Sequence, residues 1–170
     1  KTAKESDLAL LAASGEMGSE HPLAGAMIEH GKSFGEILTL KKFEAVPGMG
    51  LHATIPFAGK PTVVSIGNMM FMSKLGVDVS SHVSELERLQ SEAKTSVFML
   101  LNNKPVALIA MADALKPYAK EAIAELIRMK KEVNMITGDN EKTAQAIARE
   151  VGITRVLSEV LPQDKAAMVK

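Results

Sequence analysis

The stretch Glu132–Asn140, which reads EVNMITGDN, joins a short apolar strand to the start of a helix. In the following stretch, Glu141–Val151, apolar residues recur three and four positions apart, as on one face of a helix, and Gly152 ends that helix. In an open α/β sheet, ligands bind beyond the carboxyl ends of the strands. The turn at residues 137–140 therefore lies where a phosphate and its metal are held, although capping of the helix by Asp139 or Asn140 is the alternative interpretation.

The composition limits the classes of function. The 170 residues suit one large or two small domains, and 46% of them are hydrophobic, which is enough for a core. Equal numbers of basic and acidic residues, 20 of each, give no net charge, so a nucleic-acid partner is disfavoured. The absence of cysteine excludes disulfides, cysteine-type zinc sites and thiol nucleophiles and fits a reducing compartment. No apolar run approaches the roughly 20 residues of a membrane-spanning helix, so we expect a soluble chain.

The spacing of apolar residues changes along the chain and predicts two lobes. Helical spacing over 6–15 and 22–30 gives way to alternation over 51–57 and 62–66, which is typical of half-buried neighbouring strands. From residue 106 onward, strands and helices alternate as in a parallel α/β arrangement. The expected segments are 106–111, 117–130, 132–136, 141–151 and 155–160. We therefore predict an α+β lobe over 1–105, with an antiparallel sheet flanked by helices, joined to a partial α/β lobe over 106–170.

Local patterns add detail to this division. Asn102-Asn103, between two apolar runs, predicts a hairpin. The helix expected over 22–30 has one apolar stripe, formed by Leu23, Ala26, Met27 and His30. The helix expected over 117–130 has an apolar side, as in a helix that covers a parallel sheet, formed by Ala119, Ala122, Ile123, Leu126 and Ile127.

Two glycine patterns look like nucleotide-binding motifs without the required context. The segment 48–53 fits G-x-G-x-x-A, but an alternating strand follows instead of a helix, so a Rossmann site is disfavoured. Gly31-Lys32-Ser33 ends like a P-loop, yet its spacing and preceding helix are wrong, and Lys32 is better interpreted as a helix-end charge. Two interpretations of Gly48 and Gly50 remain: a plain hairpin turn, or a turn whose missing side chains let a ligand approach the backbone closely. If a ligand passes there, alanine at Gly50 should obstruct it and leave the fold largely intact, unless the residue also needs a positive φ.

Several polar residues are candidates for a site. His21 precedes a helix start in a stretch that also holds Glu16, and an imidazole with a carboxylate can recognise adenine. A surface or capping histidine is the alternative. Lys165 and Asp113 follow predicted strands, where a cation can neutralise a phosphoryl group, and a solvated lysine and a turn cap are the alternatives. The methionines of 69–72 favour core packing over a soft-metal site.

Taken together, five motifs in this order resemble those of the heavy-metal-transporting P-type ATPases, and the copper exporters most closely. They are Ser19-Glu20-His21-Pro22-Leu23, Pro47-Gly48-Met49-Gly50, Gly67-Asn68, Thr137-Gly138-Asp139-Asn140 and Leu161-Pro162-Gln163-Asp164-Lys165. The resemblance extends over nearly the whole chain. It implies that the first lobe is a nucleotide-binding domain and that the second is part of a phosphorylation domain of the haloacid dehalogenase class.

The resemblance also implies a role for each matching residue. Residues of the first lobe would bind ATP: Glu16 and His21 at the adenine, Gly48 and Gly50 along the nucleotide, and Gly67 with Asn68 completing the pocket. Residues of the second lobe would handle the phosphoryl group: Thr137, Gly138 and Asp139 hold it, Lys165 stabilises its charge and Asp113 supports the site. A hinge between the lobes would bring the γ-phosphate to its acceptor.

The implied function is that of the ATP-binding, cytoplasmic fragment of a Cu(I) pump. Its partners would be an adenine nucleotide with Mg²⁺ and the actuator, membrane and metal-binding domains of the same pump. The family's Asp-Lys-Thr-Gly-Thr and Gly-Asp-Gly-x-Asn-Asp motifs do not occur in these residues, so the magnesium site is incomplete and we expect no hydrolysis by this chain alone. A zinc or cadmium pump and a regulatory nucleotide-binding module are the alternatives. A small phosphatase would need an Asp-x-Asp nucleophile, which the sequence lacks.

Overall fold

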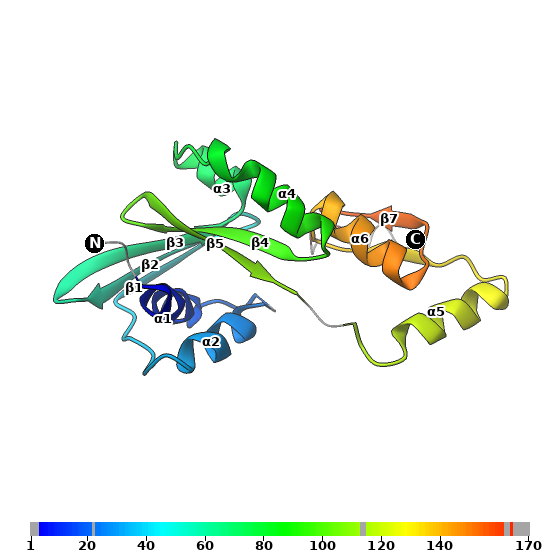
Figure 1. The fold of residues 1–170 in the computed structure, drawn as a ribbon, viewed down its shortest axis with the longest axis horizontal. Helices are drawn as coiled ribbons and strands as arrows, with labels where there is room; N and C mark the ends of the chain where they lie inside the picture. The colour runs from blue at the N-terminus through cyan, green and yellow to red at the C-terminus, as the bar shows by residue number, and fades with distance from the viewer. Residues whose placement is uncertain (1–3, 22, 113–114, 162–163, 165–170) are drawn as a thin grey trace. The chain divides into compact units, whose positions relative to one another are not determined.

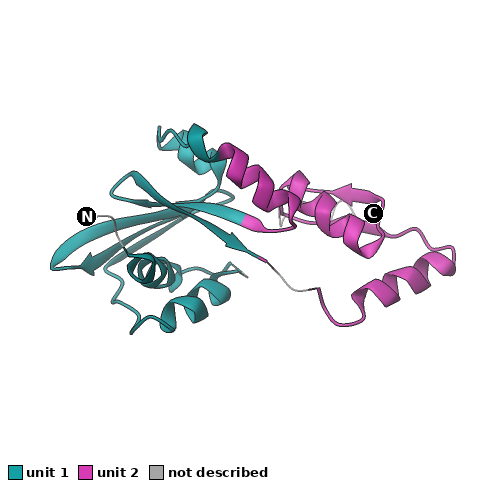
Figure 2. Ribbon diagram, viewed as in Figure 1, with its two compact units in different colours: residues 1–82, 96–111 teal, residues 83–95, 112–170 magenta. Residues whose placement is uncertain are grey.

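The computed structural model describes residues 4–21, 23–112, 115–161 and 164. It forms two compact units, one of residues 1–82 with 96–111 and the other of residues 83–95 with 112–170 (Figure 2). The chain therefore passes between the units three times, after residues 82, 95 and 111. The division into a nucleotide-binding domain over 1–105 and a partial phosphorylation domain over 106–170 stays a prediction.

The first unit is built on a five-stranded sheet with the order β1-β2-β3-β4-β5 (Figure 1). Its strands are β1 (Lys42–Val46), β2 (Gly50–Phe57), β3 (Lys60–Gly67), β4 (Thr95–Leu101) and β5 (Lys104–Met111). The pairs β1–β2, β2–β3 and β3–β4 are antiparallel. The predicted α+β lobe with an antiparallel sheet flanked by helices is confirmed.

The strand β5 differs from the sequence prediction in its sheet. Residues 106–111 were expected to begin the parallel α/β arrangement, and this expectation is wrong because β5 is the edge strand of the five-stranded sheet. The predicted hairpin explains the difference: Asn102 and Asn103 have φ angles of 48° and 62°. Two successive residues with positive φ reverse the chain in a two-residue turn, which places β5 beside β4.

The helices α1 (Glu5–Glu16) and α2 (Ala24–Lys32) pack against each other, and α1 also contacts β2 and β3 (Figure 1). The alternation predicted for β2 is confirmed, since Leu51, Ala53 and Ile55 are buried. They belong to a core that also includes Leu11, Val64, Ile66 and Met99. Burial of this apolar surface is the main force that holds the helices on the sheet.

The buried side of α2 matches the predicted stripe only in part, since Met27 is buried and Leu23, just before the helix, packs against the core. The buried residues of α2 are Ala24, Met27 and Gly31, whereas Ala26 and His30 are exposed. A Cβ at Gly31 would overlap the Ala13 side chain and the Ala9 carbonyl of α1. The glycine therefore allows the two helices to approach closely, which the apolar spacing alone did not indicate.

Two short helices follow β3 in the first unit: α3 (Met69–Lys74) and the 3₁₀ helix η1 (Ser80–His82). Phe71 and Met72 of α3 are buried, at 1% and 0% exposure. Met70, in contrast, is 60% exposed. Packing therefore accounts for Met72 as predicted, and the methionine run is divided between core and surface.

The second unit contains the expected strand and helix order after residue 130. Its elements are α4 (Val83–Ser91), α5 (Ala119–Arg128), β6 (Asn134–Ile136), α6 (Glu141–Val151) and β7 (Arg155–Leu157). The strands β6 and β7 are parallel. Asn140 caps α6 by accepting a hydrogen bond from the Thr143 backbone N–H at 3.1 Å, and Gly152 ends it with a φ of 85°.

The expectation that the apolar side of the helix over 117–130 is covered is wrong for the described residues. None of the residues of α5 is buried, and Leu126 and Ile127 are 42% and 46% exposed. The parallel sheet of the second unit has two strands of three residues each, which offer too little surface to cover an amphipathic helix. Over the described ranges, no helix combines the length and apolar character needed to cross a membrane.

Candidate functional site

Two glycines of the first unit are paired with each other on the neighbouring strands β2 and β3. Gly50, the first residue of β2, is paired with Gly67, the last residue of β3. A Cβ at Gly67 would overlap the Phe71 ring, and a Cβ at Gly50 would overlap the Ile66 carbonyl oxygen. The expectation that alanine at Gly50 leaves the fold intact is therefore wrong: the packing of the protein itself requires both glycines.

Asn68 ties this glycine pair to the turn before β2. Its side-chain Nδ2 donates to the Gly48 carbonyl at 2.9 Å, and its backbone N–H donates to the Met49 carbonyl at 2.9 Å. Its Oδ1 accepts from the Phe71 backbone N–H at 3.0 Å, which caps α3. Gly48 has a φ of 71°, a conformation that favours glycine. The structure thus brings Gly48, Gly50, Gly67 and Asn68 together, and Asn68 already serves the fold.

Glu16 ends α1 above the same sheet and is only 4% exposed. A Cβ on the preceding Gly15 would lie 3.6 Å from the Ala53 Cβ and 3.8 Å from Leu51 Cδ1, so the end of α1 packs on the first half of β2. Burial raises the pKa of the Glu16 carboxyl, and the opposing effects of a Ser19 hydrogen bond and of the charge of His21 are smaller.

His21 is exposed, in the turn between α1 and α2. Its Nδ1 accepts from the Leu23 backbone N–H at 3.3 Å, and its own backbone N–H donates to Ser19 Oγ at 3.2 Å. The capping interpretation of this histidine is therefore visible in the structure. A neutral ring that accepts at Nδ1 carries its proton on Nε2, which leaves a donor for a ligand.

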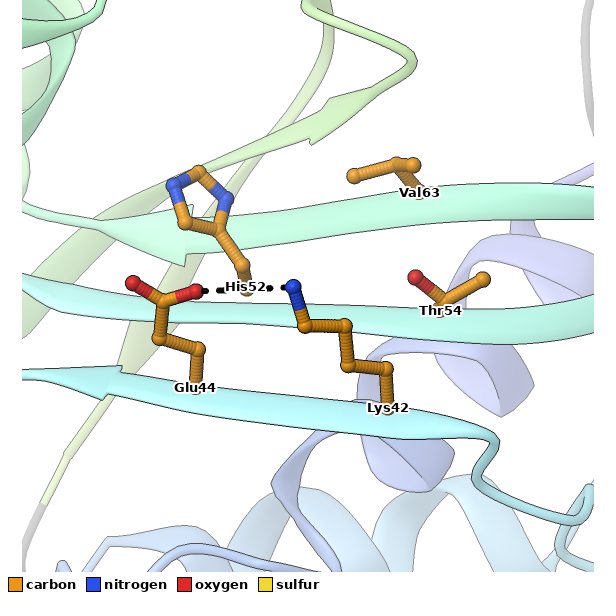
Figure 3. A pocket seen from close by; sticks show the side chains of 5 residues that line it. All are labelled: Lys42, Glu44, His52, Thr54 and Val63. Carbon is orange, nitrogen blue, oxygen red and sulfur yellow. Dashed lines mark ion pairs between the residues drawn. The ribbon is translucent and has the colours of Figure 1, made fainter.

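A shallow hollow of about 240 Å³ lies on the sheet face opposite α1, and its lining residues come from β1, β2 and β3 (Figure 3). They are Lys42, Glu44, His52, Thr54 and Val63. Lys42 Nζ and Glu44 Oε2 are 4.0 Å apart. His52 Nδ1 is 2.8 Å from Ser65 Oγ, and its ring lies 4.9 Å from that of Phe71. The hollow was not predicted from the sequence, because its residues become neighbours only through strand pairing.

The predicted phosphoryl loop lies in the second unit, directly after β6. Thr137 Oγ1 donates to Asp139 Oδ2 at 2.7 Å and accepts from the Asp139 backbone N–H at 3.1 Å. The loop is also bonded to the end of β7 and to the segment after it. The Thr137 N–H donates to the carbonyl of Leu157, the last residue of β7, at 2.9 Å, and the Glu159 N–H donates to the Asp139 carbonyl at 2.9 Å. Gly138 is exposed between the two polar residues. The loop is thus fixed at both its side chains and its backbone.

One partner of this loop was not predicted from the sequence. Thr95 Oγ1 donates to Asp139 Oδ1 at 3.2 Å, although the two residues are 44 positions apart. No motif marks Thr95, and only the placement of 83–95 in the second unit reveals the contact. Asp113 and Lys165, the remaining predicted site residues, lie outside the described residues.

Comparisons with known proteins agree with the predicted resemblance. Residues 2–170 match the haloacid dehalogenase-like hydrolase family. A copper-exporting P-type ATPase of Staphylococcus saprophyticus is 40% identical over 161 residues, which are 94% of this chain and 20% of the relative. A copper-exporting P-type ATPase of Staphylococcus aureus gives the same identity and coverage. The chain therefore spans about a fifth of the length of the curated relatives it matches.

Solved structures share the fold. A zinc-transporting PIB-type ATPase in the E2.Pi state has a TM-score of 0.65 and 30% identity, over 98% of this chain and 26% of that chain. The N-domain of a copper-transporting P-type ATPase has a TM-score of 0.51 and 22% identity, over 66% of this chain and 93% of that chain. The chain belongs to the haloacid dehalogenase-like hydrolase family, and over nearly its whole length it is similar to heavy-metal P-type ATPases.

Proposed function

We propose that this chain is the ATP-binding part of an ATP-driven heavy-metal pump, with Cu(I) as the transported ion. One structural observation carries the proposal: the linked glycines Gly48, Gly50 and Gly67 lie where β2 begins and β3 ends, and α1, which ends at the buried Glu16, packs its last turn on the first half of β2. The names of the curated relatives support copper, and that of the zinc-transporting structure supports the alternative of zinc.

The polar groups of this end fit an adenine ring. Burial raises the pKa of Glu16. The carboxyl oxygens can accept a hydrogen bond from the amino group of adenine, and the raised pKa favours the protonated form, which would also donate to N1. His21 adds a ring that can stack and an Nε2 that can donate, since its Nδ1 is engaged by the Leu23 N–H. We propose that Glu16 and His21 hold the base.

The linked glycines fit the rest of the nucleotide. At Gly48 the φ of 71° and the lack of a side chain let a ligand come close to the backbone. Asn68 holds the Gly48 carbonyl in place, so in this proposal it acts by shaping the turn and Gly67 by giving the turn room. Both residues therefore support the pocket through the fold.

In the second unit we propose that Thr137, Gly138 and Asp139 hold the phosphoryl group, with Lys165 and Asp113 in support. Mg²⁺ would enter with ATP, because this ion is commonly bound by one or two carboxylates together with the phosphates of a nucleotide. The γ-phosphate acceptor and the remaining magnesium ligands belong, in this proposal, to other segments of the pump, as do the actuator, membrane and metal-binding domains. The chain would lie on the cytoplasmic side of the membrane.

Calorimetric titration of the 170-residue chain with ATP, ADP, AMP and GTP tests the proposal. We expect the three adenine nucleotides to bind with similar affinity, because the proposed contacts are to the base, and GTP to bind more weakly, because guanine reverses the donor and acceptor pattern at N1. A chain that binds none of the four nucleotides would remove the proposal. ATP hydrolysis by the complete pump is then measured with Cu(I) and with Zn(II). The metal that stimulates hydrolysis identifies the transported ion, and hydrolysis that neither metal stimulates would favour a regulatory module over a pump.

A further inference from the structure

Both carboxylate oxygens of Asp139 are held by threonine hydroxyl groups. Thr137 Oγ1 donates to Oδ2 at 2.7 Å, from within the same loop. Thr95 Oγ1 donates to Oδ1 at 3.2 Å, from the first residue of β4. The aspartate side chain can change its rotamer about χ1 and rotates broadly about χ2, so a donor from its own loop to one oxygen leaves the carboxylate able to change its orientation about both torsions. A second donor to the other oxygen removes this freedom.

The segment that carries Thr95 is fastened to the same loop at a second point. Thr143 Oγ1, in the first turn of α6, donates to the Lys94 carbonyl at 3.2 Å and accepts from Asn140 Nδ2 at 2.9 Å. Thr143 is 1% exposed, so these bonds satisfy a hydroxyl that would otherwise be buried without a partner. The exposed ion pair of Lys142 with Glu87 adds little to this attachment. The position of Thr95 is therefore fixed by the hydrogen bond between its neighbour Lys94 and the buried Thr143 of α6.

We propose that Thr95 is a positioning residue of the phosphoryl site, whose hydroxyl fixes the orientation of the Asp139 carboxylate. The inference rests on the proposed function, because it gives Asp139 a task that requires a fixed geometry. Groups that act on a transferring phosphoryl contribute most when they are oriented in advance. The alternative is that Thr95 only stabilises the start of β4, with no effect on the side chain of Asp139.

The first test uses the isotope-labelled 170-residue chain and the three-bond NMR couplings that report the χ1 rotamer of Asp139, together with its carboxyl ¹³C signal. We expect one rotamer in the native chain and in Thr95→Ser, which keeps the hydroxyl. In Thr95→Val and Thr95→Ala, which lack it, we expect averaged couplings. Thr54→Val, the same change on β2, is the matched control and should leave the Asp139 signals unchanged. Native-like couplings in both hydroxyl-free variants would overturn the inference, and Thr95→Ala keeps the test valid should valine disturb the fold.

The second test measures ATP hydrolysis by the complete pump. We expect Thr95→Val to lower kcat about tenfold or more while the KM for ATP stays unchanged, and Thr95→Ser to restore kcat. A pump whose kcat is insensitive to Thr95→Val would contradict the inference and leave the proposed function standing. A pump that hydrolyses no ATP with its native Thr95 would instead contradict the proposed function. If Thr95 had a purely structural role, its substitution would change the stability of the protein, and kcat would not fall selectively while the KM for ATP stays unchanged.

Discussion

Gly50 of β2 and Gly67 of β3 lie opposite each other in the antiparallel ladder, and Phe71 occupies space that their side chains would need. Phe71 is itself 1% exposed, and its ring lies 4.9 Å from that of His52. The glycine pair therefore does more than form a turn. It allows α3 to pack on the end of the sheet, and this packing can be tested separately from any ligand.

The first prediction is that Gly67→Ala lowers the free energy of unfolding by about 1–3 kcal/mol, the usual cost of inserting a group into a well-packed interior. The measurement is urea denaturation followed by circular dichroism. Gly25→Ala is the matched control: Gly25 lies in α2 with no atom within 4 Å of the added Cβ, so this change should stabilise by about 0.5–1 kcal/mol. Equal stability of the two variants would contradict the packing seen at Phe71.

The second prediction concerns pH and Glu16. The pKa of this carboxyl is raised above its ordinary value of 4.5 by burial, so the folded state binds the proton more tightly than the unfolded state. Its contribution to stability is fully present below pH 4.5 and is lost as the pH rises through the folded-state pKa. We expect Glu16→Gln to raise the Tm at pH 8 more than at pH 4.5. The exposed Glu20→Gln is the control, and an identical pH profile for Glu16→Gln and the parent would contradict this assignment.

The elements that the sequence predicted best are those whose signals are local. The cap at Asn140, the stop at Gly152 and the turn at Asn102-Asn103 each depend on a few neighbouring residues, and each is present in the structure. The proposal that Glu16 and the glycines form one pocket required more, namely the order of motifs in a family. Composition and periodicity alone would have left Gly48 and Gly50 as a hairpin turn.

The features that the sequence did not predict depend on contacts between distant segments. The edge strand β5 has the apolar pattern of a buried parallel strand, but its neighbour in the sheet decides its role. The burial of α2 is set by Gly31, whose missing Cβ matters only because α1 is beside it. Thr95 belongs to no recognisable motif. It meets Asp139 only because the fold brings residues 83–95 into the second compact unit. The spacing of apolar residues indicates which face of a helix or strand is apolar, but it does not indicate which other element packs against that face.

The third prediction is that His21→Ala weakens ATP binding by about 1–3 kcal/mol, because the hydrogen-bonding group of a pocket is removed and its partner is left unpaired. Calorimetry with ATP and AMP measures this loss, which should be similar for both if the contact is to the base. His30→Ala, an exposed histidine of α2 in the same unit, is the matched control and should bind like the parent. Unchanged affinity of His21→Ala would remove His21 from the site.

The fourth prediction is that the 170-residue chain binds ATP but forms no phosphoenzyme, with or without Cu(I) or Zn(II). The resemblance places the acceptor aspartate in an Asp-Lys-Thr-Gly-Thr motif, and that motif does not occur in these residues. In the proposed site Asp139, whose two oxygens accept hydrogen bonds from Thr95 and Thr137, orients the phosphoryl group and does not accept it. Incubation with γ-labelled ATP and an acid quench is the measurement. An acid-stable, hydroxylamine-sensitive label that disappears in Asp139→Asn would show that Asp139 is the acceptor, and the positioning role of Thr95 would then have to be abandoned.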